Sequence, residues 1–308
     1  MEYNAYGGYN ASELAELRDR SLRSLRRTLL ANVLQASSLR ASMTLGCVSL
    51  LANATIVVVV ARSRRLHCRC FALIGQLAVA DCIVGAAYVA TGLKRVLRLL
   101  YALDEVGTSR RCGLEMIAAY FGQSASILVA IAVALDRCAG TCLYSRYRSP
   151  AKSRHFVWTV SLFSWTYAVT DAIVLLITTT DDKLIPNCYL VSSVSDEFYE
   201  FQSVHKLLLV AITLLLYVGI IAFTFVKQRN ARRDVEGHCE VSLKKSLQTR
   251  LVYMLTLVSA LYLTTQLLSR LLMALLSRLP AVARGDYGPY IRTLVLLNGC
   301  ANFFVYVL

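Results

Sequence analysis

The sequence predicts an all-α integral membrane protein, a bundle of seven transmembrane helices. Of its 308 residues, 56% are hydrophobic and only 17% are charged, and the mean hydropathy is +0.53. Soluble domains of this length carry more charge and interleave it more evenly. Apolar blocks inside lipid must be helical, because every backbone amide there needs an internal partner. Seven blocks are long enough to cross a hydrocarbon core of about 30 Å, approximately at 40–61, 70–93, 112–138, 156–178, 205–227, 250–277 and 289–308.

The segment before the first block, 1–39, is expected to lie outside the cell. It lacks the apolar core of a signal peptide, so the first membrane helix should act as its own signal. Leucines recur at helical spacing from Leu14 to Leu29, and arginines fill the other face. This pattern favours a short amphipathic helix on the membrane surface, and the alternative is a basic tail without structure. Asn10 opens a glycosylation sequon that is usable on the outer side.

The Lys and Arg residues between the blocks predict the orientation. With the Cys112 end outside, the inner loops carry 15 of these residues and the outer loops carry 8, as the positive-inside rule requires. Arginines of 1–39 weaken this contrast. The net charge of +14 is explained by basic inner loops and by attraction to acidic membrane lipids, so no nucleic acid partner is expected.

The ten cysteines indicate one disulfide. In this orientation only Cys112 and Cys188 fall in or beside outer loops, where the environment is oxidising. We therefore expect these two to pair, and the alternative is two free thiols.

Polar residues in the middle of the apolar blocks predict a pocket at mid-depth. Asp81 lies inside the second block, and a carboxylate there costs at least about 2.5–3.5 kcal/mol on insertion scales, so it should face a polar interior. Hard oxygen ligands around one carboxylate suit a small cation such as Na⁺. The alternative is a hydrogen-bonded packing core that holds water and no ion. The residues expected in this pocket are Asn53, Asp81, Ser126, Asn298 and Asn302.

Charged residues in the outer halves of the blocks predict a second polar region. Arg270 and Arg292 stand in the sixth and seventh blocks, and Glu115 and Asp171 stand in the third and fourth. One interpretation is that they line a ligand cavity that favours an anionic or polar ligand. The alternative is that the long side chains reach the outer interface or pair with the acidic loop at 181–200. No enzyme motif is present, neither a Gly-rich phosphate loop nor His-Glu-x-x-His nor a nucleophile elbow, so no catalysis and no organic cofactor is expected.

Together, the seven blocks, the outer cysteine pair and the Asp136-Arg137 pair resemble a rhodopsin-like (class A) G-protein-coupled receptor over about 40–308. The run 77–81 fits the family's LAxAD motif, and Cys112 lies 25 positions before Arg137, as in the family. Asp136-Arg137 fits its D-R-Y motif with Cys in the place of Tyr. Asn298, Asn302 and Tyr306 fit N-x-x-x-N-P-x-x-Y with Phe in the place of Pro. The sequence of residues 66–81 is most similar to that of the nematode serpentine chemoreceptors of the Srsx class.

The resemblance implies a receptor in the plasma membrane, with its N-terminus outside, that passes an extracellular signal to a heterotrimeric G protein. The ligand would be a small molecule, an odorant-like compound or a peptide. The activation switch would consist of Asp136, Arg137, Tyr217 and Tyr306. The ligand pocket would be formed by Glu115, Ala119, Tyr120, Gln123, Tyr262, Arg270 and Arg292.

The chain also departs from the family pattern. The sixth block lacks the C-W-x-P motif, and Tyr262 stands near the position of its tryptophan. Ala119 occupies the position of the amine-binding aspartate of monoamine receptors, which disfavours a monoamine ligand. Two alternatives therefore remain: a multi-pass transporter or channel, and a degenerate receptor that does not signal.

Overall fold

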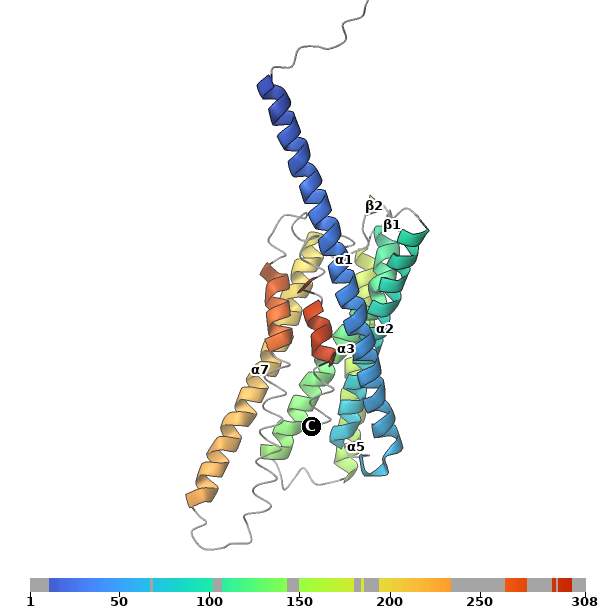
Figure 1. Ribbon diagram of the computed structural model, residues 1–308. Helices are drawn as coiled ribbons and strands as arrows, with labels where there is room; N and C mark the ends of the chain where they lie inside the picture. Colours follow the sequence, from blue (N-terminus) through green and yellow to red (C-terminus); the bar gives the residue numbers. More distant parts are fainter. Residues whose placement is uncertain are drawn as a thin grey trace, which may run out of the picture.

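The computed structural model describes residues 11–66, 69–101, 107–142, 150–179, 184–185, 194–233, 264–275, 290–291 and 293–300. Side chains are described from Ser37 onward. The chain is helical apart from two short strands (Figure 1), and the residues at 264–275 and 290–300 add further helical turns. The named elements are α1 (Ala11–Arg62), η1 (Arg64–Leu66), α2 (Arg69–Leu100), β1 (Gly107–Thr108), α3 (Ser109–Cys142), α5 (Pro150–Thr178), β2 (Leu184–Ile185) and α7 (Asp196–Arg233).

Five described helices are long and apolar enough to cross a membrane, and they contain the first five predicted spans. The segments that qualify are 37–62, 69–98, 109–139, 155–178 and 196–226. The prediction of an all-helical membrane protein is confirmed for the described residues. The sixth and seventh predicted spans, 250–277 and 289–308, lie partly outside the described residues, which contain helix at 264–275 and 290–300.

Helix α1 begins earlier than predicted. The expected boundary near residue 39 is absent, because one continuous helix runs from Ala11 to Arg62. The 52 residues span about 78 Å at 1.5 Å per residue. No proline or glycine occurs between residues 11 and 45, so nothing in the sequence interrupts the helix before the membrane span. Figure 1 shows the N-terminal part of α1 projecting beyond the bundle, where a separate helix along the membrane surface was expected.

Helix α3 is the centre of the bundle. In its most apolar stretch 72% of the residues are buried, against 11% in α7. It packs against α2, α5 and α7, while α1 packs against α2. The backbones of α1 and α2 approach closely at a pair of glycines, since a Cβ placed on Gly85 would lie 2.8 Å from the carbonyl oxygen of Gly46. Small residues at such crossings are typical of helices that associate in membranes.

The outer surface of the bundle is apolar, as contact with lipid requires. Helix α5 exposes Trp158, Leu162 and Ile177, with 71–74% of each residue accessible. In contrast, Trp165 points into the bundle, where its ring lies 5.6 Å from that of Phe121. Large accessible apolar residues on several helices and polar residues in the interior therefore fit a membrane environment.

The strands β1 and β2 pair antiparallel, with Gly107 opposite Ile185. This pairing ties the chain just before α3 to the chain after α5. It lies at the same end as Cys112, which is fully buried and disulfide-bonded. The partner sulfur is not among the side chains that the structure describes, and Cys188 lies outside the described residues, as does Asn10.

Candidate functional site

A cavity of about 60 Å³ opens between α3, α7 and the helical residues 264–275. Four residues of the predicted ligand pocket line it: Ala119, Tyr120, Gln123 and Arg270. The residues Tyr262 and Arg292 lie outside the described residues. The other lining residues are Tyr88, Met116, Leu175, Val194, Phe198, Tyr199, Gln202, Ser203, Lys206, Met273 and Val295.

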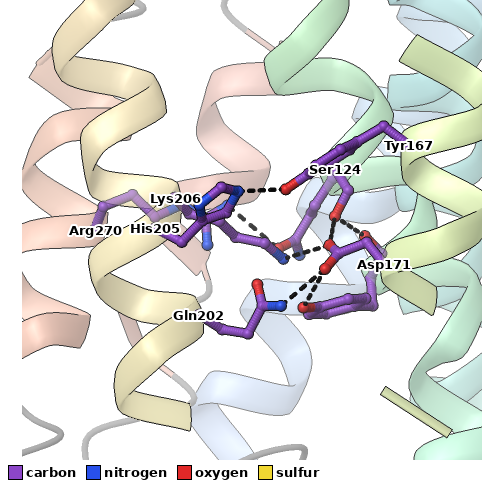
Figure 2. Close-up of polar contacts among 9 residues, drawn as sticks. Ser124, Tyr167, Asp171, Gln202, His205, Lys206 and Arg270 are labelled. Atoms are coloured by element: carbon purple, nitrogen blue, oxygen red, sulfur yellow. Dashed lines mark hydrogen bonds and ion pairs between the residues drawn. The ribbon is translucent and has the colours of Figure 1, made fainter. Parts of the chain in front are cut away.

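The buried carboxylate of Asp171 on α5 joins three helices beside this cavity. Its oxygens accept hydrogen bonds from Ser124 Oγ at 2.5 Å, Gln202 Nε2 at 2.8 Å and the Tyr120 hydroxyl at 3.2 Å. Lys206 Nζ completes the group at 3.7 Å. Figure 2 shows Ser124 of α3 and two residues of α7, Gln202 and Lys206, converging on Asp171. A buried carboxylate is tolerated where several donors and a cation surround it, as here.

Two buried cations lie on the cavity wall. Lys206 is 3% accessible, and its Nζ lies 3.5 Å from the centre of the Tyr120 ring, in addition to its ion pair with Asp171. Arg270 is 6% accessible, and its Nη2 donates to Gln123 Oε1 at 3.4 Å. The cavity is therefore bordered by positive charge from two helices, α7 and 264–275.

Gln202 presents a buried acceptor beside these cations. Its Nε2 donates to Asp171, whereas its Oε1 is buried and has no hydrogen-bond partner among the described residues. Turning the amide over would place its oxygen against the carboxylate, so the bond to Asp171 fixes which atom points away. A buried acceptor without a donor is costly, and a bound ligand or water can supply one.

Beside the Asp171 cluster, Tyr167 of α5 and His205 of α7 form a further contact between the two helices. The Tyr167 hydroxyl lies 2.5 Å from His205 Nε2, and the imidazole stacks on Phe201. Figure 2 shows this pair beside the Asp171 cluster. Neither residue is among those that line the cavity.

Glu115, which was expected in the ligand pocket, lies elsewhere. It forms ion pairs with Lys94 and Arg98 of α2 and with Arg111 of its own helix, at 2.8 Å from Arg98 Nη2. It is not one of the cavity-lining residues. Glu115 lies one helical turn from Ala119, nearer the Cys112 end of α3, and its described partners are the basic residues of α2 and of its own helix.

A smaller cavity of about 10 Å³ lies deeper in the bundle, around Asp81. Ser126 Oγ donates to Asp81 Oδ1 at 2.9 Å, and Asn298 accepts from Thr265 at 3.3 Å. Asn53 is fully buried, and its amide donates to the Gly299 carbonyl at 3.0 Å. Three of the predicted residues, Asp81, Ser126 and Asn298, line the cavity, and Asn302 lies outside the described residues. The volume suits one water or one small ion.

Two residues, Gln123 and Val295, lie between the two cavities. Gln123 lines both of them, and it donates to the Tyr88 hydroxyl at 3.3 Å while it accepts from Arg270. Gln266 closes the deeper cavity from the helical residues 264–275, and its Oε1 is buried with no hydrogen-bond partner among the described residues. The sequence analysis did not single out Gln266.

At the opposite end of α3, the predicted switch residue Asp136 is buried and pairs with Arg69 of α2. The Arg69 guanidinium also lies 4.3 Å above the Phe156 ring of α5. This arrangement connects α2, α3 and α5 next to Arg137. Tyr217 of α7 packs against the apolar cluster that contains Val129. Tyr306 lies outside the described residues.

Besides Gln266, the sequence analysis missed Lys206, Gln202 and Arg69. A signal existed for Lys206, since a lysine inside the predicted block 205–227 is itself a mark of a functional position. Gln202 stands one helical turn before Lys206, so the two face the same side. Arg69 looked like one of several basic loop residues, and only the packing of α2 against α3 distinguishes it.

Comparison with known families gives one match. Residues 46–308 match the family described as serpentine type 7TM GPCR chemoreceptor Srsx. The matched range begins within α1 and includes both cavities and the Asp136 end of α3. A search of curated proteins finds no match.

Proposed function

The chain belongs to the Srsx family of serpentine seven-transmembrane chemoreceptors, and on this basis we propose that it passes an external chemical signal to a heterotrimeric G protein. The family is a receptor family and not an enzyme family. The protein would act in the plasma membrane, with its N-terminus outside and the Asp136 end of α3 at the cytosol. Membrane lipids would surround its apolar outer face.

The cavity beside Asp171 is the observation that carries this proposal. It lies towards the Cys112 end of α3, and most of its wall comes from three helical segments, α3, α7 and 264–275, with single residues from α2, α5 and 293–300. A ligand in it would contact all three at once. Because the polar groups of the wall are buried and belong to different helices, their hydrogen bonds depend on how these helices are placed. A ligand that binds one placement better than another shifts the population towards it.

The inner end of the bundle would contact and activate the G protein. In the proposed mechanism the sixth helix swings outward, and Arg137 meets the G protein together with Tyr217 and Tyr306. The Arg69–Asp136 ion pair holds the carboxylate next to Arg137 from the α2 side. A rearrangement of α3 against α2 would therefore act on Arg137 through Asp136.

The Asp81 cavity supplies a place for regulation between the two ends. We propose that it holds water or a Na⁺ ion, coordinated by the oxygens of Asp81, Ser126 and Asn298. The donor set fits a small hard cation in its chemistry, and the volume of about 10 Å³ fits a single occupant. Gln123 borders this cavity and the outer one. An occupant of either cavity would therefore contact the Gln123 side chain.

Nucleotide exchange tests the receptor function. Membranes that hold the chain should accelerate GDP–GTP exchange on at least one member of a G-protein panel, and Arg137→Ala should remove most of that acceleration. Arg64→Ala is the matched control, because it removes one exposed arginine from η1 at the same side of the membrane. Exchange should survive in this control, since Arg64 has no place in the proposed switch.

Surface labelling must show equal amounts of each protein in this experiment. Exchange that Arg137→Ala and Arg64→Ala reduce equally would contradict a specific role of Arg137. No exchange with any G protein would favour a receptor that does not signal. Ion or solute flux through the same membranes would favour the transporter alternative.

A further inference from the structure

We propose that the outer cavity binds a small organic monocarboxylate that also carries a hydroxyl or amine donor. This inference rests on the proposed function in that it takes the cavity as the ligand site. It names the chemical class of the ligand, which membership of the family does not specify. Three features of the wall carry it: charge, an acceptor without a donor, and size.

The charge on the wall selects an anion. Lys206 and Arg270 both line the cavity, and the described lining residues include no carboxylate. Asp171 stands behind the wall, where its oxygens already accept bonds from Ser124 and Gln202. An arginine and a lysine in a buried site form strong charge-assisted hydrogen bonds with a carboxylate.

A single negative charge fits better than two. Lys206 already pairs with Asp171 at 3.7 Å, so the carboxylate of Asp171 lies close to any anion that Lys206 binds. Asp171 repels a phosphate dianion about twice as strongly as a monocarboxylate at the same distance, so the single charge is preferred. A cationic ligand would meet two like charges in a buried site, which is strongly unfavourable.

The acceptor on the wall selects a donor on the ligand. Gln202 Oε1 is buried without a hydrogen-bond partner among the described residues, and the bond of Nε2 to Asp171 fixes its direction. Gln202 and Lys206 are four residues apart on α7 and lie on one face. A ligand whose carboxylate meets Lys206 can therefore place a hydroxyl or amine near Gln202. Satisfying a buried acceptor contributes to specificity, because an analogue without the donor leaves it unmet.

The size and the remaining wall limit the ligand to a short carbon chain. The volume of about 60 Å³ corresponds to roughly four to six water-sized groups, at about 10–15 Å³ each. Met116, Leu175 and Met273 add apolar surface to the lining of the cavity. A four-carbon acid with one hydroxyl group meets all three requirements.

Direct binding to the purified full chain in lipid nanodiscs tests this proposal without a G protein. The probes are 3-hydroxybutanoate, butanoate, 3-hydroxybutanamide and inorganic phosphate, titrated at millimolar concentrations and followed by saturation-transfer NMR. We expect 3-hydroxybutanoate to bind at least about tenfold more tightly than its neutral amide, because the amide loses the charge-assisted bonds. It should also bind more tightly than butanoate and phosphate.

Two variants assign the contacts, and a third is the control. Arg270→Gln should weaken binding of both carboxylates at least about tenfold. Gln202→Met should remove the preference for 3-hydroxybutanoate over butanoate and leave the preference for carboxylate over amide. Arg111→Gln is the control, because Arg111 is a largely exposed arginine outside the cavity, and it should bind as the unmodified chain does. Thermal unfolding confirms that each variant is folded. If Arg270→Gln does not fold, Arg270→Lys replaces it in the binding experiment.

Three results would overturn the proposal. The first is amide or phosphate binding as tight as carboxylate binding. The second is the absence of carboxylate binding to a folded chain. The third is carboxylate binding that a folded Arg270→Gln variant leaves unchanged. Failure of the receptor function would show differently, as normal carboxylate binding without nucleotide exchange.

Discussion

At the scale of single residues, Asp171 determines how α3, α5 and α7 meet. Its carboxylate accepts three hydrogen bonds and forms one ion pair with side chains of α3 and α7. The charge of Lys206 relies on Asp171 more than the charge of Asp171 relies on Lys206. The other described contact of the Lys206 ammonium group is the ring of Tyr120. Removing the acid leaves a buried cation, whereas removing the lysine leaves an acid with three donors.

This asymmetry predicts the result of a double-mutant cycle. Asp171→Asn should lower the free energy of unfolding by about 3–5 kcal/mol, because it leaves a buried charge without its counter-charge. Lys206→Met should cost less. The double variant should recover most of the loss caused by Asp171→Asn, since the ammonium group that lost its counter-charge is also removed. Denaturant titration in bicelles measures all four proteins, and additive losses would show that the two residues do not interact.

At the scale of helices, close approach depends on glycine at particular positions. A Cβ on Gly85 would lie 2.8 Å from the Gly46 carbonyl oxygen and 3.0 Å from the Leu50 amide nitrogen. Both are backbone atoms of α1, so they cannot move aside as a side chain would. Gly219 on α7 is different, because a Cβ there meets nothing within 4 Å.

The two glycines predict opposite effects of the same substitution. Gly85→Ala should destabilise the protein by about 1–3 kcal/mol, because α1 and α2 must separate. Gly219→Ala should be neutral or should stabilise by up to about 1 kcal/mol, because alanine favours a helix over glycine. Thermal unfolding in nanodiscs measures both, and equal effects would contradict the close packing of α1 on α2.

At the scale of the whole molecule, hydropathy predicts the spans but not the contacts between them. The first five blocks appear as helices because length and apolar composition suffice to define them. A helix from Leu14 to Leu29 was predicted, but its continuation into the first span was not, because the change from polar to apolar sequence suggests a boundary that the backbone does not have. Glu115 and Asp171 gave the same signal in the sequence, a carboxylate in an outer half. In the structure Glu115 pairs with basic residues of α2, whereas Asp171 binds donors of α3 and α7 behind the cavity wall. Periodicity alone does not reveal which neighbours each residue meets.

The arrangement of the molecule also links its two ends through α3. The outer cavity, the Asp81 cavity and the Asp136–Arg69 pair follow one another along this helix, and Gln123 borders the first two. Movement of α3 relative to α2 or α7 would therefore change the contacts at each of the three sites. Communication between the outer cavity and the inner face is thus a physical expectation of this packing.

Activation of a G protein by an anion in the outer cavity, acting through Arg137, is tested most directly by nucleotide exchange with 3-hydroxybutanoate added. We predict that the acid stimulates exchange in the unmodified chain. Arg270→Gln should lose the stimulation and keep the basal exchange, whereas Arg137→Ala should lose both. Stimulation that survives Arg270→Gln, or that does not need Arg137, would contradict a connection between the cavity and the inner face.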